Sequence, residues 1–301
     1  MHHGNHFYGH AHVLAEYCGL DPEHPPRIEG YVQHGWNVVD GLGAGTPYMP
    51  GRPIFVWSEQ TRRRAWSMGR RQATVIGAPF LYLLRLAPEP AEPVTREGTI
   101  WYPFHGWEGQ RVQGSHARLI DEIMATEDGP VTFCLYWNEY HNDRIRAEYE
   151  KAGLVVCHGY RGRHWLDTDT RFLHKQLAEL RRHRRVASNR LSSAIFYGVA
   201  AGCVPAVYGD PMRLENEDRP TAERIRRQWP ELHGKHPDPA TARPVAMAEL
   251  GDGYLASPAE LSVMLGWSAT PPGATQTGAA QTGAAQTGAA QTGASRGAVP
   301  A

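Results

Sequence analysis

The chain has 301 residues, of which 41% are hydrophobic and 21% are charged, and its formal net charge at pH 7 is zero. This length allows one large or two ordinary domains, and the composition is that of a folded globular protein. The balance of 31 Lys and Arg against 31 Asp and Glu argues against a general binder of nucleic acids or anionic membranes, because such proteins depend on excess positive charge.

The N-terminal half predicts short strands that alternate with helices. Helices are expected over residues 7–20 and 60–68, and strands over residues 30–33, 53–57 and 73–76. Residues 87–98 are rich in proline and charge, which is typical of a linker. The first domain is therefore expected at residues 1–90, and it is short.

The C-terminal half repeats the same alternation more regularly. Strands are expected over residues 99–104, 131–137, 154–157, 185–187 and 204–208, and helices over residues 115–126, 142–152, 169–182 and 192–201. The strands are apolar on both faces, which is typical of a parallel sheet covered by helices. A second α/β domain is therefore expected at residues 99–268.

The last part of the chain repeats the pentad QTGAA, and after Pro271 it has no aromatic or branched aliphatic residue before Val299. Such a segment cannot bury enough apolar surface to offset its ordering entropy. We expect a disordered tail over residues 271–301.

The four cysteines, Cys18, Cys134, Cys157 and Cys203, have no CxxC pair and no zinc-binding spacing. The N-terminal histidines include His10 and His12, but residues two apart diverge on a helix, so we expect no metal site. Neither a signal peptide nor a transmembrane segment is expected, which favours a cytoplasmic protein. Basic runs such as Arg181–Arg185 leave open a peripheral contact with the inner membrane face.

Polar residues follow nearly every expected strand, where parallel sheets bind their ligands. The polar residues at these ends are His34, Glu59, His105, Arg161, Ser188, Asn189 and Tyr208. After the strand at 185–187, a helix begins near Ser192 and Ser193, so its N-terminal N–H groups and serine hydroxyls favour an anion. This pattern indicates a nucleotide phosphate site, although a serine here can also be a simple helix cap.

Two groups of motifs resemble bacterial glycosyltransferase-like proteins of capsule and O-antigen polysaccharide assembly. One is YVQHG at Tyr31–Gly35, and the other is SNRLSSAIFYGVAAGCVPAVYGD together with ELGDGYLASPAELSVMLGW at Glu249–Trp267. The resemblance implies the GT-B architecture, in which two Rossmann-like domains with parallel sheets face each other. It also implies a nucleotide-sugar donor on the C-terminal domain, an acceptor facing the N-terminal domain and no metal or other cofactor.

Transfer with inversion needs a base for the acceptor hydroxyl and stabilisation of the departing phosphate. We expect transfer with inversion. His34 is the first candidate for the base, with Glu59 as the alternative or as its orienting partner. Ser188, Asn189, Ser192 and Ser193 are expected to hold the phosphates. His105 and Gly106 would lie beside the phosphates, Arg161 would neutralise the leaving group, and Tyr208 would complete the binding site.

The acceptor is expected to be a glycan, a lipid-linked sugar or a small molecule, and the oligomeric state stays open. One alternative is a sugar-nucleotide epimerase of the 2-epimerase type, which would need more carboxylates than the few at the expected cleft. Another is a non-catalytic protein that binds sugar nucleotides as part of a biosynthetic complex.

Overall fold

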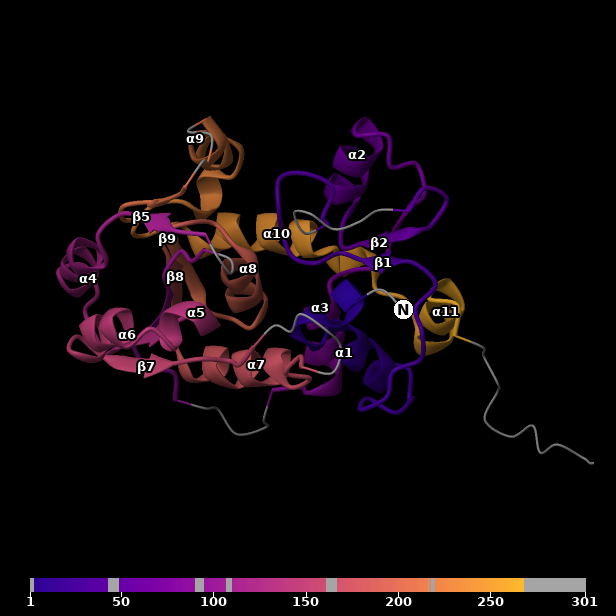
Figure 1. Ribbon diagram of the computed structural model, residues 1–301, viewed down its shortest axis with the longest axis horizontal. Helices are drawn as coiled ribbons and strands as arrows, with labels where there is room; N and C mark the ends of the chain where they lie inside the picture. The colour runs from indigo at the N-terminus through magenta and orange to yellow at the C-terminus, as the bar shows by residue number, and fades with distance from the viewer. Residues whose placement is uncertain are drawn as a thin grey trace, which may run out of the picture. The chain divides into compact units, whose positions relative to one another are not determined.

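The computed structural model describes residues 3–42, 49–89, 95–106, 110–160, 167–215, 217 and 220–267. Residues 1–269 form one compact unit. Within it the described strands form two parallel sheets and a short antiparallel ribbon, and helices surround them (Figure 1).

The larger sheet has five strands, all parallel, in the order β7-β6-β4-β8-β9. Its strands are β4 (Thr99–Tyr102), β6 (Val131–Cys134), β7 (Leu154–Val156), β8 (Arg185–Ser188) and β9 (Val204–Val207). Chain order runs outward from β4 to β7 on one side and from β8 to β9 on the other. The direction of winding therefore reverses between β4 and β8, and ligands of open α/β sheets bind at such a reversal.

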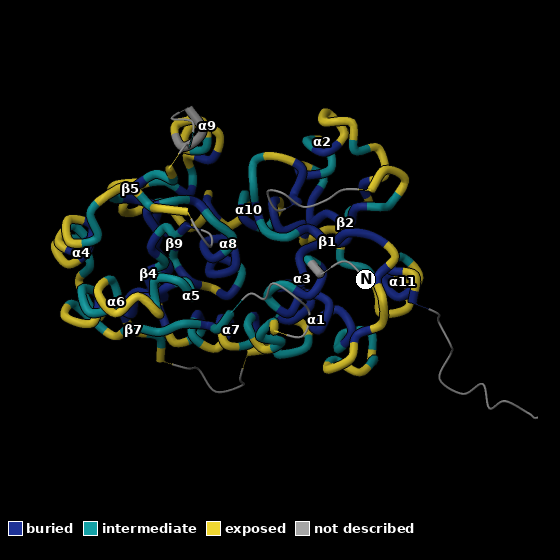
Figure 2. The backbone as a smooth tube through the Cα atoms, in the orientation of Figure 1, coloured by how far each residue is buried: buried dark blue, intermediate teal, exposed yellow. Residues whose placement is uncertain are grey.

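Successive side chains of these strands enter different cores, because residues of a strand alternate between the two faces. Trp101 and Ala187 pack with the helices α4 (His116–Met124) and α6 (Asp143–Glu150). Ile100 and Val186 pack with α7 (Phe172–Arg182) and α8 (Ser193–Ala200) on the opposite face. In Figure 2 the inner strands of this sheet are mostly buried and the edge strand β7 is not, while α4 and α6 include exposed residues.

The smaller sheet has three parallel strands in the order β1-β2-β3, namely β1 (Tyr31–Val32), β2 (Ile54–Val56) and β3 (Ala73–Val75). Ile54 and Val56 point to a small core with Ala65 of α2 (Glu59–Ser67). Phe55 points to the other face, where the helices α1 (His10–Tyr17) and α3 (Pro79–Leu86) pack. This inner core is continuous with the α7 and α8 face of the larger sheet, so both sheets are stabilised by one shared core.

The chain then returns to its N-terminal half. The ribbon joins β5 (Val112–Gln113) to β10 (Arg213–Leu214), and α9 (Pro220–Gln228) and α10 (Pro239–Leu250) follow it. Helix α10 packs on both α8 and α2, so it connects the two sheets' layers (Figure 1). Helix α11 (Pro258–Met264) lies beside the N-terminal region, where the Trp267 indole N–H donates to the Pro26 carbonyl at 3.1 Å.

The expected mixed α/β fold with parallel sheets is confirmed. All eight expected strands exist, although β4 and β6 end at Tyr102 and Cys134, earlier than expected. The helix expected over 7–20 is shorter, because a 3-10 turn at His3–Gly9 precedes α1. The sequence patterns did not predict α3, α5 (Trp137–Tyr140), α9, α10, α11 or the β5–β10 ribbon. Residues 271–301, where the tail was expected, lie outside the described residues.

Candidate functional site

A cavity of about 1090 Å³ lies at the carboxyl ends of the larger sheet. All five strands contribute residues at or just after their carboxyl ends. These include Phe104 and His105, Leu135 and Tyr136, His158 and Gly159, Ser188 and Asn189, and Tyr208 and Gly209. The winding reversal between β4 and β8 is thus part of the cavity. This is the place where the topology predicts a ligand.

Residues of the N-terminal half line the same cavity. His34, Gly35 and Trp36 come from the loop after β1, Tyr8 comes from the 3-10 turn before α1, and His10 is the first residue of α1. The Trp36 backbone N–H donates to Ser193 Oγ at 2.9 Å, which ties this loop to the first residue of α8. The structure therefore brings His34 and the two serines expected to bind phosphate to one cavity.

The N-terminus of α8 faces this cavity through Ser192 and Ser193. Ser192 is the cap residue, but its side chain makes no capping hydrogen bond. Ser193 already accepts the Trp36 N–H, and its hydroxyl proton can still be donated. The two hydroxyls and the positive end of the helix dipole are a suitable environment for an anion.

Asn189 and Ser188 make hydrogen bonds within the protein at the cavity wall. The Asn189 side chain accepts the Phe104 N–H at 2.7 Å and donates to the Asp210 carbonyl at 2.7 Å. It therefore connects the loops that follow β4, β8 and β9. Ser188 Oγ accepts the Arg190 N–H at 3.2 Å. Both residues line the cavity, and these hydrogen bonds shape its wall.

Tyr208 lines the cavity while its hydroxyl is bound elsewhere. The hydroxyl donates to Glu127 at 2.6 Å and accepts the Trp101 indole N–H at 3.2 Å. Burial, together with the bond to Glu127, raises the pKa of Tyr208. Its phenol therefore stays protonated at neutral pH, and only the ring is available to a ligand.

His105 and Tyr136 form a flat aromatic surface in the cavity wall. Their rings stack with centroids 4.1 Å apart and an angle of 16° between the planes. Gly106 is not among the cavity-lining residues, and its carbonyl lies 3.0 Å from His105 Nδ1. Arg161 lies outside the described residues.

Glu59 lies away from this cavity. It follows the cap residue Ser58 at the start of α2 and forms ion pairs with Arg62 at 2.6 Å and Arg63 at 3.1 Å. These arginines lower the pKa of its carboxyl, chiefly through the hydrogen bond from Arg62. Glu59 lines a separate hollow with Asp252 and other residues of the chain's return. The spacing of Glu59 to arginines three and four residues later already indicated a helix-surface ion pair.

Two polar pairs in the cavity wall were not predicted from the sequence. His158 Nε2 and the Tyr102 hydroxyl are hydrogen-bonded at 3.0 Å, and burial lowers the pKa of His158 to about 4. Arg190 forms a two-point ion pair with Glu217, at 2.6 and 2.8 Å, and lies 3.8 Å from the Phe104 ring centroid. His158 and Arg190 follow β7 and β8 closely, so the strand-end pattern could have found them.

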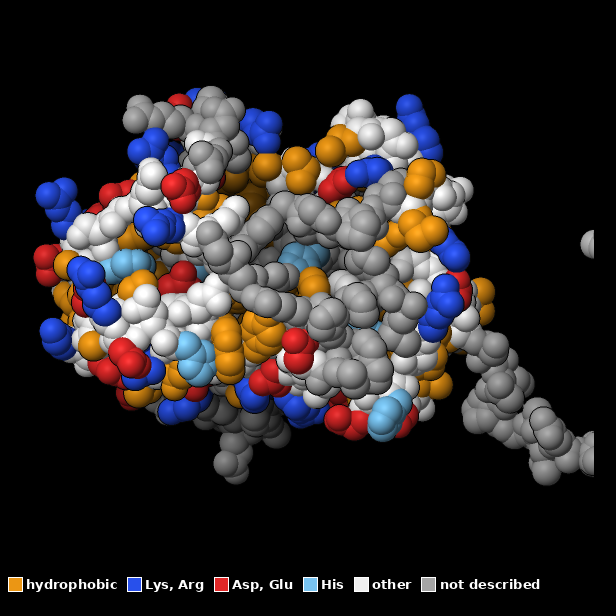
Figure 3. Space-filling view, viewed as in Figure 1, with side chains coloured by type: hydrophobic (Ala, Val, Ile, Leu, Met, Phe, Trp, Pro, Cys, Tyr) orange, Lys and Arg blue, Asp and Glu red, His pale blue; other side chains and the backbone are white. Residues whose placement is uncertain are grey.

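Some of the charged side chains that line the cavity form ion pairs, and others are exposed to solvent. Arg70 is paired with Asp40 at 3.2 Å, and the exposed Arg226 and Lys235 are further cations in the lining. Across the face in Figure 3, positive and negative side chains are interspersed and form no single basic patch among the described residues. The site therefore offers a few cations to an anionic ligand rather than an extended positive surface.

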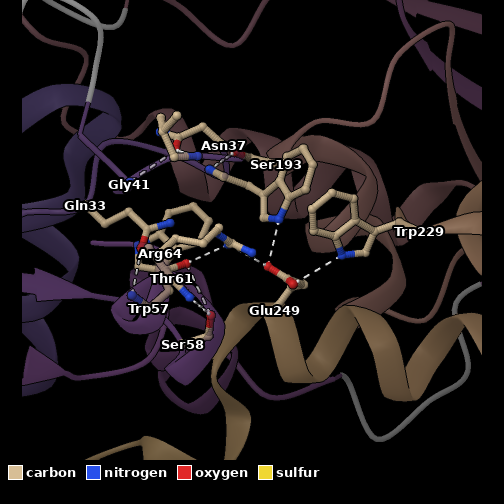
Figure 4. Close-up of polar contacts among 12 residues, drawn as sticks. Gln33, Asn37, Gly41, Trp57, Ser58, Thr61, Arg64, Ser193, Trp229 and Glu249 are labelled. Carbon is tan, nitrogen blue, oxygen red and sulfur yellow. Dashed lines mark hydrogen bonds and ion pairs between the residues drawn. The ribbon is translucent and has the colours of Figure 1, made fainter. Parts of the chain in front are cut away.

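A buried carboxylate is hydrogen-bonded to the loop after β1, which lines the cavity (Figure 4). Glu249 of α10 accepts the indole N–H of Trp36 at 2.9 Å, the indole N–H of Trp229 at 3.2 Å and the Arg64 guanidinium at 3.1 Å. Trp36 lies in the loop after β1, Trp229 directly follows α9, and Arg64 belongs to α2. No local pattern indicates this network, because its members are up to 213 residues apart along the chain.

Within the described ranges, no group of three or more His, Cys, Asp or Glu side chains is arranged to hold a metal ion. In the same residues, no helix combines the length and the apolar character needed to cross a membrane.

No protein-family model and no curated protein matches the sequence. Among solved structures, MnaA of S. aureus with UDP is 9% identical, with a TM-score of 0.40 over 73% of this chain and 62% of that chain. Os79 of O. sativa with UDP is 15% identical, with a TM-score of 0.33 over 69% of this chain and 50% of that chain. The chain thus spans less than two thirds of each of these proteins, and likeness of this extent assigns no family.

Proposed function

We propose that this protein is a cytoplasmic glycosyltransferase of polysaccharide assembly. It would move a sugar from a nucleotide-sugar to an acceptor, with inversion and without a metal, using a GT-B arrangement of its two halves. The observation that carries the proposal is the 1090 Å³ cavity, to which the ends of five parallel strands and the loop after β1 all contribute. Its size is at the upper end of ordinary small-molecule sites, which suits a ligand as large as a nucleotide-sugar.

On the donor side, the diphosphate would lie at the N-terminus of α8. The Ser192 hydroxyl, which caps nothing, and Ser193 would donate hydrogen bonds to it. The exposed cations Arg226 and Lys235 would balance its charge, and Arg161 stays part of the proposal as a further cation. The stacked pair of His105 and Tyr136 offers a flat surface on which a nucleobase could stack.

On the acceptor side, His34 would act as the base. Its imidazole would take the proton of the acceptor hydroxyl as the acceptor oxygen bonds to the sugar's anomeric carbon. The bond from that carbon to the phosphate oxygen breaks, and the nucleotide leaves with the electron pair. Glu59 takes no part in this proposal, because it lines a different hollow. The acceptor would be a glycan, a lipid-linked sugar or a small molecule.

An epimerase of the 2-epimerase type is less well supported. The described carboxylates that line the cavity are Asp40, Glu217 and Glu223. Two of them are already neutralised, Asp40 by Arg70 and Glu217 by Arg190. Few free carboxylates would thus be available for proton transfer at the sugar.

The test is a panel of UDP-glucose, GDP-mannose, dTDP-glucose and CMP-sialic acid, each compared with its bare nucleotide. We expect one nucleotide-sugar and its bare nucleotide to raise the melting temperature of the protein. The sugar of that nucleotide-sugar should be transferred to an acceptor from a glycan panel. His34→Ala should abolish transfer and leave nucleotide affinity nearly unchanged, since the base contacts the acceptor. Stabilisation without transfer would indicate a non-catalytic binder, and conversion of the free sugar-nucleotide would indicate the epimerase. No binding at all would refute the proposal.

A further inference from the structure

His10 occupies an unusual position at the edge of the cavity. It is the first residue of α1, its side chain is only 1% exposed, and it lines the cavity. Two residues with positive φ precede it, Tyr8 at 59° and Gly9 at 77°. A Cβ on Gly9 would come within 2.4 Å of the Thr170 carbonyl oxygen, so the close turn requires glycine here. Such strained turns cluster at functional sites.

Both ring nitrogens of His10 lack a hydrogen-bond partner among the described residues. The other buried histidines there have partners. His6 and His12 are bonded to each other, His158 is bonded to Tyr102, and His183 is bonded to the Glu179 carbonyl and Thr132. An unsatisfied buried polar group destabilises the folded state, so its retention calls for an explanation.

The imidazole of His10 is neutral at physiological pH. Burial lowers the pKa of His10 to about 3, and the charge of His34 adds to this shift. The nearby Gln33 backbone opposes the shift, although its geometry is not that of a hydrogen bond. A neutral imidazole has one N–H and one lone pair. It can therefore both donate to and accept from a hydroxyl group, while it offers little to an anionic phosphate.

The surroundings of His10 favour a sugar over an anionic group. The rings of Tyr8 and Trp57 lie near it, with centroids at 5.8 and 6.2 Å. Trp57 is fully buried and does not line the cavity, whereas Tyr8 does. The Tyr8 ring beside a neutral hydrogen-bonding group suits the apolar face and the hydroxyls of a pyranose. We propose that His10 binds a sugar hydroxyl of the ligand in this cavity, an inference that rests on the proposed sugar transfer.

The first experiment compares His10→Phe with His158→Phe by thermal denaturation. Removing an unpaired buried group should leave the melting temperature of His10→Phe equal to or above that of the wild type. His158→Phe should melt lower, because it leaves the Tyr102 hydroxyl without its partner. A fall in His10→Phe as large as that in His158→Phe would overturn the inference, since it would show that His10 is bound within the protein.

The second experiment measures ligand binding, using the four nucleotide-sugars and their bare nucleotides. In His10→Phe the affinity for the bound nucleotide-sugar should fall about tenfold and that for its bare nucleotide should stay unchanged. His10→Gln, which retains donor and acceptor atoms, should restore part of the loss. If His10→Phe leaves the affinity for the nucleotide-sugar unchanged, the wild-type protein is titrated with glucose while the ¹⁵N signals of His10 are followed. A shift of these signals would show that the acceptor sugar is bound there instead. Unchanged affinity together with unshifted His10 signals would refute the inference.

These outcomes separate the two proposals. If no nucleotide-sugar binds the wild type, the proposed function fails. The melting temperatures and the glucose titration then still decide whether His10 is an unpaired group that binds sugar hydroxyls.

Discussion

At the scale of single residues, Glu249 shows how a buried charge can be retained. Its carboxylate is 4% exposed and is bonded to the Arg64 guanidinium and to two indole N–H groups. A buried ion tolerates removal from water only when such partners surround it. Because one of the indoles belongs to Trp36, whose backbone binds Ser193, Glu249 also positions the loop that lines the cavity.

Glu249→Ala should lower the free energy of unfolding by about 3–5 kcal/mol, because it leaves two buried indole donors unpaired and removes the ion pair of the partly buried Arg64. Urea denaturation measures this loss. Glu150→Gln is the matched control. It removes an ion pair with Arg146 at 3.2 Å in which Glu150 is half exposed, and such pairs contribute at most about 1 kcal/mol. Similar losses in both variants would contradict a special role for Glu249.

The two serines of α8 should respond differently to substitution. Ser192→Ala should weaken nucleotide binding by about 1–3 kcal/mol and leave stability unchanged, since its hydroxyl makes no capping bond. Ser193→Ala should also lower stability, because the Trp36 N–H loses its acceptor. Calorimetric titration with the stabilising nucleotide and thermal melts of the same samples test both. Unchanged affinity in the double variant would exclude a phosphate site here.

At the scale of elements, α10 fixes the return of the chain to its N-terminal half. The helix ends at Leu250 and is capped by Gly251, which has a φ of 75°. The Ala78 N–H donates to the Leu250 carbonyl at 2.8 Å. A Cβ on Gly251 would lie 1.8 Å from the Trp57 carbonyl oxygen. Only glycine allows both this backbone conformation and this close approach.

Gly251→Ala should therefore lower the free energy of unfolding by more than the roughly 1–2 kcal/mol that left-handed backbone costs an alanine. Gly51→Ala is the control, because Gly51 has a φ of 85° and a Cβ added to it would meet no described atom within 4 Å. Denaturation curves of the two variants separate the steric clash from the backbone cost. Equal losses would show that α10 can move away from β2 without penalty.

At the scale of the whole molecule, burial of histidines links stability to pH. The pKa is lowered in six of the described histidines, namely His10, His12, His116, His158, His174 and His233. In each, burial is the largest cause. The unfolded chain regains ordinary histidine pKa values near 6.5, so below that pH it binds protons that the folded state does not.

Stability should therefore be full above about pH 6.5 and fall as the pH drops toward the folded values, about 4 for His158 and about 3 for His10. Each of these two groups contributes up to about 1.4 kcal/mol per pH unit in this range. Urea denaturation at pH 7.5 and pH 5.5 measures the slope, and His158→Gln should reduce it. Equal unfolding free energies at the two pH values would contradict burial of neutral histidines.

Local patterns in the sequence were sufficient for the strands and for the parallel sheets. A strand that is buried on both faces needs a continuous apolar run, and such a run is visible within a few residues of sequence. β6 is an example, since all four of its residues are buried. The strand-end rule also led to His34, His105, Ser192 and Ser193, which line one cavity. It works because parallel strands bring their carboxyl ends to one edge, whichever helices follow.

Only the tertiary structure decided which polar residues share that cavity. Glu59 follows a strand as His34 does, yet its helix carries it to another hollow, where two arginines pair with it. His10 belongs to a helix, which offered no reason to place it beside β1, and the positive-φ turn at Tyr8 and Gly9 brings it there. Sequence determines local periodicity, whereas the partners of a buried side chain depend on packing between segments that are distant along the chain.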